Sequence, residues 1–91
     1  MTFDAVVEVR LREGVADPEG ATIHSAMGQL GMDRVREVHV GRIFRLSIDA
    51  DDAGEAEELA VRAAASLLAN PVLEDYEVTV SDQAPSGATP R

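Results

Sequence analysis

The chain of 91 residues is long enough for one domain with one core, but short for a core plus a deep, walled active site. Its 17 acidic and 8 basic residues give a formal net charge of −9, which disfavours nucleic acid and anionic lipid as partners because their phosphates would be repelled. It has no cysteine, no stretch typical of a signal peptide and no apolar run approaching the ~18 residues of a membrane span, so we expect a soluble cytoplasmic protein without disulfides or cysteine-ligated zinc.

The first predicted element is a strand over residues 3–11. Its side chains alternate between a mainly apolar face and a mixed face, and β-branched valines are frequent, which is typical of a half-buried strand. Glu13-Gly14 ends it. The residues of the apolar face are Phe3, Ala5, Val7, Val9 and Leu11.

Residues 18–30 are predicted to form a helix. Asp17 can cap the free backbone N–H groups of the first turn, and Pro18 loses no hydrogen bond at the first helical position. Gly31 suits the left-handed conformation that ends many helices. The apolar residues at helical spacing are Ile23, Ala26, Met27 and Leu30.

Two further strands are predicted in the middle of the chain. The first covers residues 35–42 and contains three valines. The second covers residues 43–48, where apolar side chains alternate with the others. Gly41 indicates a tight turn or a bulge between the two strands, so that they form either a sharp hairpin or a bent ribbon.

A second helix is predicted between Asp52 and Asn70-Pro71. Asp52 can cap its first turn, and Glu55 takes the position of a capping-box acid three residues later. Pro71 ends the helix, because its ring cannot continue the hydrogen-bond ladder. The residues that keep the helical period are Ala56, Leu59, Ala60, Ala63 and Leu67.

The last predicted strand covers residues 76–80, where Tyr76, Val78 and Val80 alternate with polar residues. The folded domain is therefore expected to span residues 1–80. Residues 81–91 are rich in Ser, Gly, Pro and Ala and are predicted to form a disordered tail.

The element order is β-α-β-β-α-β. With right-handed crossovers it predicts a single α+β domain of ferredoxin-like type, a four-stranded antiparallel sheet with two helices on one face. The other face is left open, and we expect it to contact another subunit rather than water. The residues expected on the open face are Val6, Glu8, Arg10, Ile43 and Arg45.

The sequence contains no convincing catalytic or metal-binding motif. The acidic run 49–54 has some features of a calcium loop but lacks acids at the fifth and twelfth ligand positions, and helix capping explains it. His24 and His39 stand in no metal-ligand spacing and are expected to be structural or exposed. Glu74 and Asp75 point to opposite sides of a strand and so cannot converge on one substrate atom. We therefore expect the chain itself to bind no cofactor and no metal.

Three segments together suggest a family. They are 17–20 (Asp-Pro-Glu-Gly), 35–42 (Val-Arg-Glu-Val-His-Val-Gly-Arg) and 68–76, whose most specific part reads Ala-Asn-Pro-Val-x-Glu-Asp-Tyr. Their order and spacing over residues 3–80 resemble the PurS family, the small subunit of phosphoribosylformylglycinamidine synthase. One departure is Arg42, where the family often has lysine, so a partner contact there can differ.

The resemblance implies a role in the fourth step of purine biosynthesis. In that family, a large synthase subunit uses ATP to activate the amide, and a separate glutaminase subunit releases ammonia. The PurS-like subunit has no catalytic residues and is thought to bridge the other two and assist ammonia transfer. The implied partners are these two subunits and further copies of the chain, in a homodimer or homotetramer. The complex would use ATP, magnesium and glutamine.

Within this hypothesis, five residues in two regions are expected to contact partners. Gly41 and Arg42 place an exposed cation beside a glycine turn, which suits a partner surface. Asn70, Pro71 and Tyr76 form the second region. A helix stop and a buried tyrosine explain the second region equally well without any partner.

Two other hypotheses share the element order. In an amino-acid-sensing module of the ACT type, the loop 13–17 would hold an amino acid between two subunits. An acylphosphatase-like enzyme would need an arginine-bearing phosphate loop at the same place. The loop 13–17 is acidic and has no arginine, which disfavours the enzyme.

Overall fold

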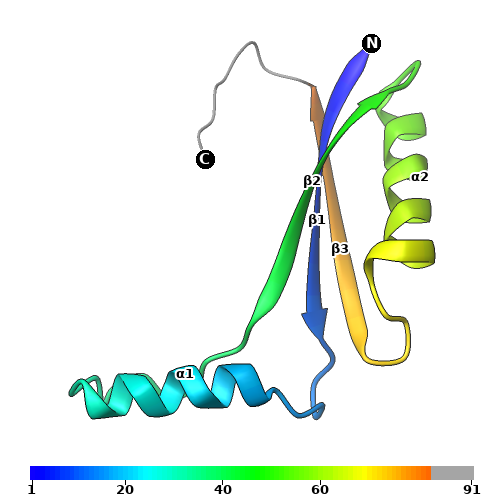
Figure 1. The fold of residues 1–91 in the computed structure, drawn as a ribbon. Helices are drawn as coiled ribbons and strands as arrows, with labels where there is room; N and C mark the ends of the chain where they lie inside the picture. The colour runs from blue at the N-terminus through cyan, green and yellow to red at the C-terminus, as the bar shows by residue number, and fades with distance from the viewer. Residues whose placement is uncertain (83–91) are drawn as a thin grey trace.

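A computed structural model describes residues 1–82 (Figure 1). No helix in this part of the chain has the length and hydrophobicity needed to span a bilayer. In chain order the elements are β1 (Thr2–Leu11), α1 (Pro18–Gln29), β2 (Gly41–Asp49), α2 (Ala53–Ala63), the π-helical turn η1 (Ala64–Leu68) and β3 (Glu74–Asp82).

The three strands form one antiparallel sheet in the order β2-β1-β3, with β1 in the centre. Val7 pairs with Phe44 on β2 and with Val78 on β3, so these three side chains share the face that α2 covers. The register also places the five residues predicted for the open face on the side opposite α2. There Arg10 forms ion pairs with Glu8 and Glu77, at 3.3 and 3.5 Å.

The core lies between β1 and α2. Phe3, Val7 and Val9 are at most 2% exposed, as the alternation of the first strand predicts. Along α2 and at the first residue of η1, small side chains at intervals of four residues allow the helix to approach the sheet closely. These fully buried residues are Ala56, Ala60 and Ala64.

The end of α2 widens into the π-helical turn η1. The Ala69 N–H donates to the Ala64 carbonyl at 3.0 Å, a bond that spans five residues instead of four. The wider turn changes which side chain faces the sheet: Leu68 packs against the core, whereas Leu67 is 81% exposed. Leu67 fits the helical period of the sequence. The π-helical turn contains one residue more than an α-helical turn, and this rotates the Leu67 side chain to the surface.

The predicted four-stranded sheet with two helices on one face is wrong. Residues 35–40, expected to be a strand, form no ladder within the described chain, and only α2 lies on the sheet. Instead they run back along α1, which projects past the end of the sheet (Figure 1). The Val35 carbonyl lies 2.7 Å from His24 Nε2 on that helix. We call residues 18–40 the α1 arm.

The physical reason for this correction is the place where β2 begins. A fourth strand needs a turn at Gly41 that lays residues 35–40 beside residues 43–48. Residues 41–49 instead run as one unbroken strand paired with β1, so no turn brings the two segments together. The pairing with β1 also ends at Gly41, so residues 35–40 have no partner on that strand either. At the other end of the sheet, β3 extends through Asp82, two residues beyond the predicted domain boundary. The rest of the predicted tail, residues 83–91, lies outside the described part.

Candidate functional site

The connection from α2 to β3, residues 68–76, is held in place by several side-chain hydrogen bonds. We call it the α2–β3 elbow. It contains the predicted contact residues Asn70, Pro71 and Tyr76, and Arg42 reaches it from β2. The structure thus brings four of the five predicted contact residues together.

Arg42 connects the elbow to β2, the strand on the other side of β1 from β3. Its Nη2 donates to the Leu68 carbonyl at 3.2 Å and to both carboxylate oxygens of Glu74, at 3.1 and 3.2 Å. Its guanidinium carbon also lies 5.4 Å from the centre of the Phe44 ring, within cation–π range. Glu74 is only 16% exposed at its side chain, so the pair is shielded on one side.

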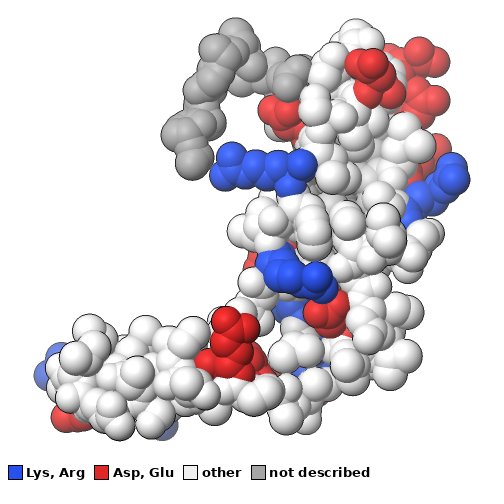
Figure 2. Space-filling view, in the orientation of Figure 1, with Lys and Arg blue, Asp and Glu red and all other residues white. Residues whose placement is uncertain are grey.

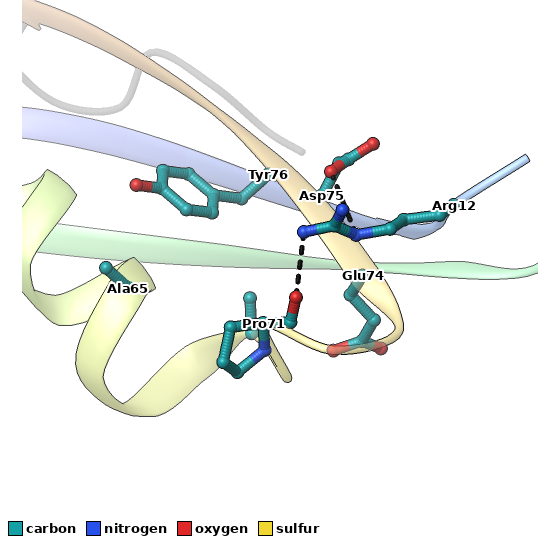
Figure 3. A pocket seen from close by; sticks show the side chains of 7 residues that line it. Arg12, Ala65, Pro71, Glu74, Asp75 and Tyr76 are labelled. Carbon is teal, nitrogen blue, oxygen red and sulfur yellow. Dashed lines mark hydrogen bonds and ion pairs between the residues drawn. The ribbon is translucent and has the colours of Figure 1, made fainter.

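Arg12, the residue directly after the central strand, also holds the elbow (Figure 3). Its Nη2 donates to the Pro71 carbonyl at 2.7 Å, and its Nε lies 3.4 Å from a carboxylate oxygen of Asp75. Its backbone N–H donates to the Leu73 carbonyl at 2.8 Å. One residue therefore fixes three points along the elbow.

Asn70 folds the elbow from within. Its side-chain oxygen accepts from the Val72 N–H at 3.0 Å, the turn that an asparagine side chain commonly makes. Its carbonyl accepts from the N–H groups of Leu73 and Glu74, and its own N–H donates to the Glu74 carboxylate at 2.7 Å. Glu74 thus accepts from both Asn70 and Arg42, which makes it the central acceptor of the elbow.

The elbow borders a shallow hollow of about 390 Å³. Tyr76 lines it from the strand, Pro71 from the turn and Ala65 from the π-helical turn (Figure 3), and Ala69 is a further apolar lining residue. Of the neighbouring residues in sequence, Leu67 and Val72 are 81% and 77% exposed. A rigid turn that displays apolar side chains around a hollow is suited to receiving an apolar side chain of another protein.

Gly41 lies apart from the elbow, at the start of β2. No hairpin or bulge occurs there, because the preceding residues are not a strand. A Cβ at this position would lie 2.7 Å from the Val9 carbonyl oxygen, so the absence of a side chain allows β2 to approach β1. Gly41 lines a second hollow of about 610 Å³ together with the loop that the ACT-type hypothesis assigned to an amino acid.

Arg12 and Glu74 were not predicted as site residues. The sequence allowed Glu74 and Asp75 to be considered only as an acid–base pair, and the structure gives them separate partners, Arg42 and Arg12. These four residues are brought together by two registers: β1 against β3, which pairs Leu11 with Glu74, and β1 against β2, which pairs Val9 with Arg42. Neither register has a signal in the sequence.

The remaining polar candidates have structural partners. His39 Nε2 lies 2.8 Å from a Glu37 carboxylate oxygen. At the start of α2, Asp52 accepts from the Glu55 N–H and Glu55 accepts from the Asp51 N–H, which confirms that capping explains the acidic run. Within residues 1–82, no group of three or more potential ligands is placed to hold a metal ion.

We expect Arg42→Glu to lower the free energy of unfolding by about 1–2 kcal/mol, because it removes charge-assisted hydrogen bonds and sets a carboxylate against Glu74. Urea unfolding of the isolated chain measures this. Arg45→Glu is the matched control: the residue lies on the same strand, is exposed and forms no ion pair or hydrogen bond within residues 1–82, so its change should stay within about 0.5 kcal/mol. Equal losses in both variants would contradict an anchoring role for Arg42.

Comparison with known proteins identifies the family. Residues 4–82 match the family described as PurS: Phosphoribosylformylglycinamidine (FGAM) synthase. The PurS subunit of Mycobacterium leprae is 44% identical over 79 residues, which cover 87% of this chain and 96% of the relative. The PurS subunit of Archaeoglobus fulgidus is 42% identical over 74 residues, covering 81% and 92%.

Solved structures agree with this. The PurS structure of Methanocaldococcus jannaschii is similar with a TM-score of 0.81 at 34% identity, covering 90% of this chain and 99% of that one. A chain of the PurLQS structure from Thermotoga maritima has a TM-score of 0.83 at 31% identity, covering 89% and 99%. The chain therefore belongs to the PurS family and is a subunit of phosphoribosylformylglycinamidine synthase, an enzyme of purine biosynthesis.

Proposed function

We propose that this chain is a non-catalytic assembly subunit, which bridges the large ATP-dependent synthase subunit and the glutaminase subunit and assists the transfer of ammonia between them. The observation that carries the proposal is the likeness to a chain of the PurLQS structure, at a TM-score of 0.83. On this proposal the chain itself binds no cofactor. ATP, magnesium and glutamine are used by the other subunits, and the complex works in the cytoplasm.

The α2–β3 elbow is the proposed contact with one of these subunits. Its backbone is held by Arg12, Arg42 and Asn70, so docking there requires little ordering of the chain. The exposed side chains of Leu67, directly before the elbow in sequence, and Val72, within it, supply further apolar area. Pre-organised turns of this kind favour binding because less conformational entropy is lost.

The α1 arm supports a homo-oligomer, either a homodimer or a homotetramer. Leu30 and Met32 are 74% and 48% exposed near the tip of the arm, and the side of the arm shown in Figure 2 carries few charges away from its two ends. Residues 35–40 are not paired with another strand in the described chain, although three valines make them suited to a sheet. A second copy of the chain would supply both an apolar partner and a strand neighbour.

The test is glutamine-driven amidine formation by the purified synthase and glutaminase subunits, with and without this chain. We expect glutamine-driven activity to fall to near background when the chain is omitted, because the two active sites are then not coupled. Activity driven by added ammonia should persist, since it bypasses the glutaminase.

Comparing glutamine-driven with ammonia-driven activity distinguishes a bridging role from other roles of the chain. Loss of both activities without the chain would indicate a part in the synthase chemistry itself and contradict a purely bridging role. Equal glutamine-driven rates with and without the chain would remove the bridging proposal altogether. Co-elution of the three subunits on size exclusion is the physical counterpart of the activity assay.

A further inference from the structure

The α1 arm is joined to the rest of the molecule by very few contacts. None of the buried core residues belongs to α1, and the helix projects away from the sheet and α2 (Figure 1). The orientation of the arm is therefore determined where the arm begins and ends. These two points, Asp17 and Val40, are adjacent in space.

One carboxylate connects them. Asp17 Oδ1 accepts from the Gly20 N–H at 2.8 Å, which caps α1. Asp17 Oδ2 accepts from the Val40 N–H at 2.9 Å, directly before β2 begins. The side chain is only 12% exposed, and His39 Nδ1 lies 3.9 Å from Oδ2.

We propose that Asp17 is a positioning residue, a clasp that closes the α1 arm at its base and sets the direction in which the arm presents its apolar side chains. An N-cap needs only one oxygen, and Asp52 at the start of α2 uses one in this way. In Asp17 the second oxygen bonds a residue 23 positions further along the chain. That second bond does nothing for helix capping.

The electrostatics of the carboxylate agree with this geometry. The pKa of Asp17 is lowered below its usual value, first by the Val40 N–H, then by the Gly20 N–H, with a smaller contribution from His39 and with burial acting in the opposite direction. The bond to Val40 is thus the largest single influence on the charged form. The clasp is closed at any pH where this carboxylate is ionised.

Asparagine at position 17 can keep one of the two hydrogen bonds but not the other. Its single carbonyl oxygen can still accept from Gly20 and cap the helix, but its NH₂ group is a donor and cannot accept from the Val40 N–H. Asp17→Asn therefore opens the clasp while leaving a good cap. Asp52→Asn is the matched control, because it makes the same chemical change at a cap with no second bond.

Hydrogen exchange of backbone amides, followed by NMR on the full chain, tests the clasp. In Asp17→Asn we expect the Val40 amide and the amides of α1 to exchange on the order of tenfold faster, with the amides of β1 unchanged. In Asp52→Asn the increase should be confined to the start of α2. Unchanged exchange at Val40, or an increase as large in β1 as in the arm, would overturn the proposal.

The consequence for assembly rests on the proposed function and is measured separately. Titrating Asp17→Asn into the synthase and glutaminase should raise the concentration needed for half-maximal glutamine-driven activity severalfold, with the maximum retained. If exchange in the arm became faster but the titration did not change, the proposal that Asp17 positions the arm would stand. Its role in assembly would be refuted. The exchange result does not depend on the partners, so failure of the two proposals can be told apart.

Discussion

Phe3→Ala will lower the free energy of unfolding by about 3–5 kcal/mol, the range observed when a buried aromatic ring is removed. Phe3 is 2% exposed and packs in the half of the core that contains Ala50 and Ala56. Its buried neighbours there are alanines, and the larger Ile48 and Val80 pack against the cluster, so removing the ring leaves a space that the two alanines are too short to fill. Domains of this size have a total stability of about 5–15 kcal/mol, so the variant retains little of it.

Urea unfolding of the isolated chain gives the value, and Phe3→Leu provides an intermediate if the alanine variant fails to fold. Leu67→Ala is the control, since it removes a large apolar side chain that is 81% exposed. Its change should lie within about 0.5 kcal/mol. A comparable loss in both variants would contradict the π-helical turn, which is what places Leu67 outside the core.

The elements governed by local chemistry were predictable from the sequence. The alternation in residues 3–11 and the Asp17-Pro18 start of α1 are signals carried by neighbouring residues, and the structure confirms the corresponding elements. The cap of α2 is confirmed in the same way. Such signals depend only on side-chain period and on the free N–H groups of the first turn.

The fourth strand could not be judged from the sequence. Residues 35–40 have the composition of a strand, but a strand exists only where a neighbour offers its N–H and C=O groups. Whether the chain turns at Gly41, so that residues 43–48 become that neighbour, depends on the pairing of residues 41–49 with β1, which is a non-local property. Leu67 shows the same limit on a smaller scale, because one additional residue in η1 is enough to change the face on which it lies.

The candidate site was partly predictable for a related reason. Asn70 and Pro71 mark the elbow through turn chemistry that is local, and Arg42 is predicted with Gly41 as a contact because an exposed cation stands beside a glycine. That Arg42 and Arg12 converge on the elbow depends on the order and register of three strands. Their contact with a partner remains a prediction, as does that of Gly41.

Gly20→Ala will destabilise the α1 arm, although the same change in most helices is favourable by up to about 1 kcal/mol. A Cβ at position 20 would overlap the Val38 carbonyl oxygen and would lie 2.8 Å from Asp17 Oδ2. The first is a backbone atom, which cannot rotate aside as the end of a flexible side chain can, and the second is bonded to the Val40 N–H. The helix must therefore shift away from residues 35–40, at a cost of about 1–3 kcal/mol, as for other overpacked sites.

Gly28→Ala is the control, and its expected effect on the free energy of unfolding has the opposite sign. Gly28 lies on the same helix, and a Cβ there would have nothing within 4 Å, so alanine at this position should stabilise the chain by up to about 1 kcal/mol. Urea unfolding distinguishes the two variants by the direction of the change, and exchange of the Val40 amide shows whether the base of the arm has opened. If Gly20→Ala stabilised the protein as Gly28→Ala does, the close packing of α1 against residues 35–40 would be wrong, and with it the geometry on which the clasp depends.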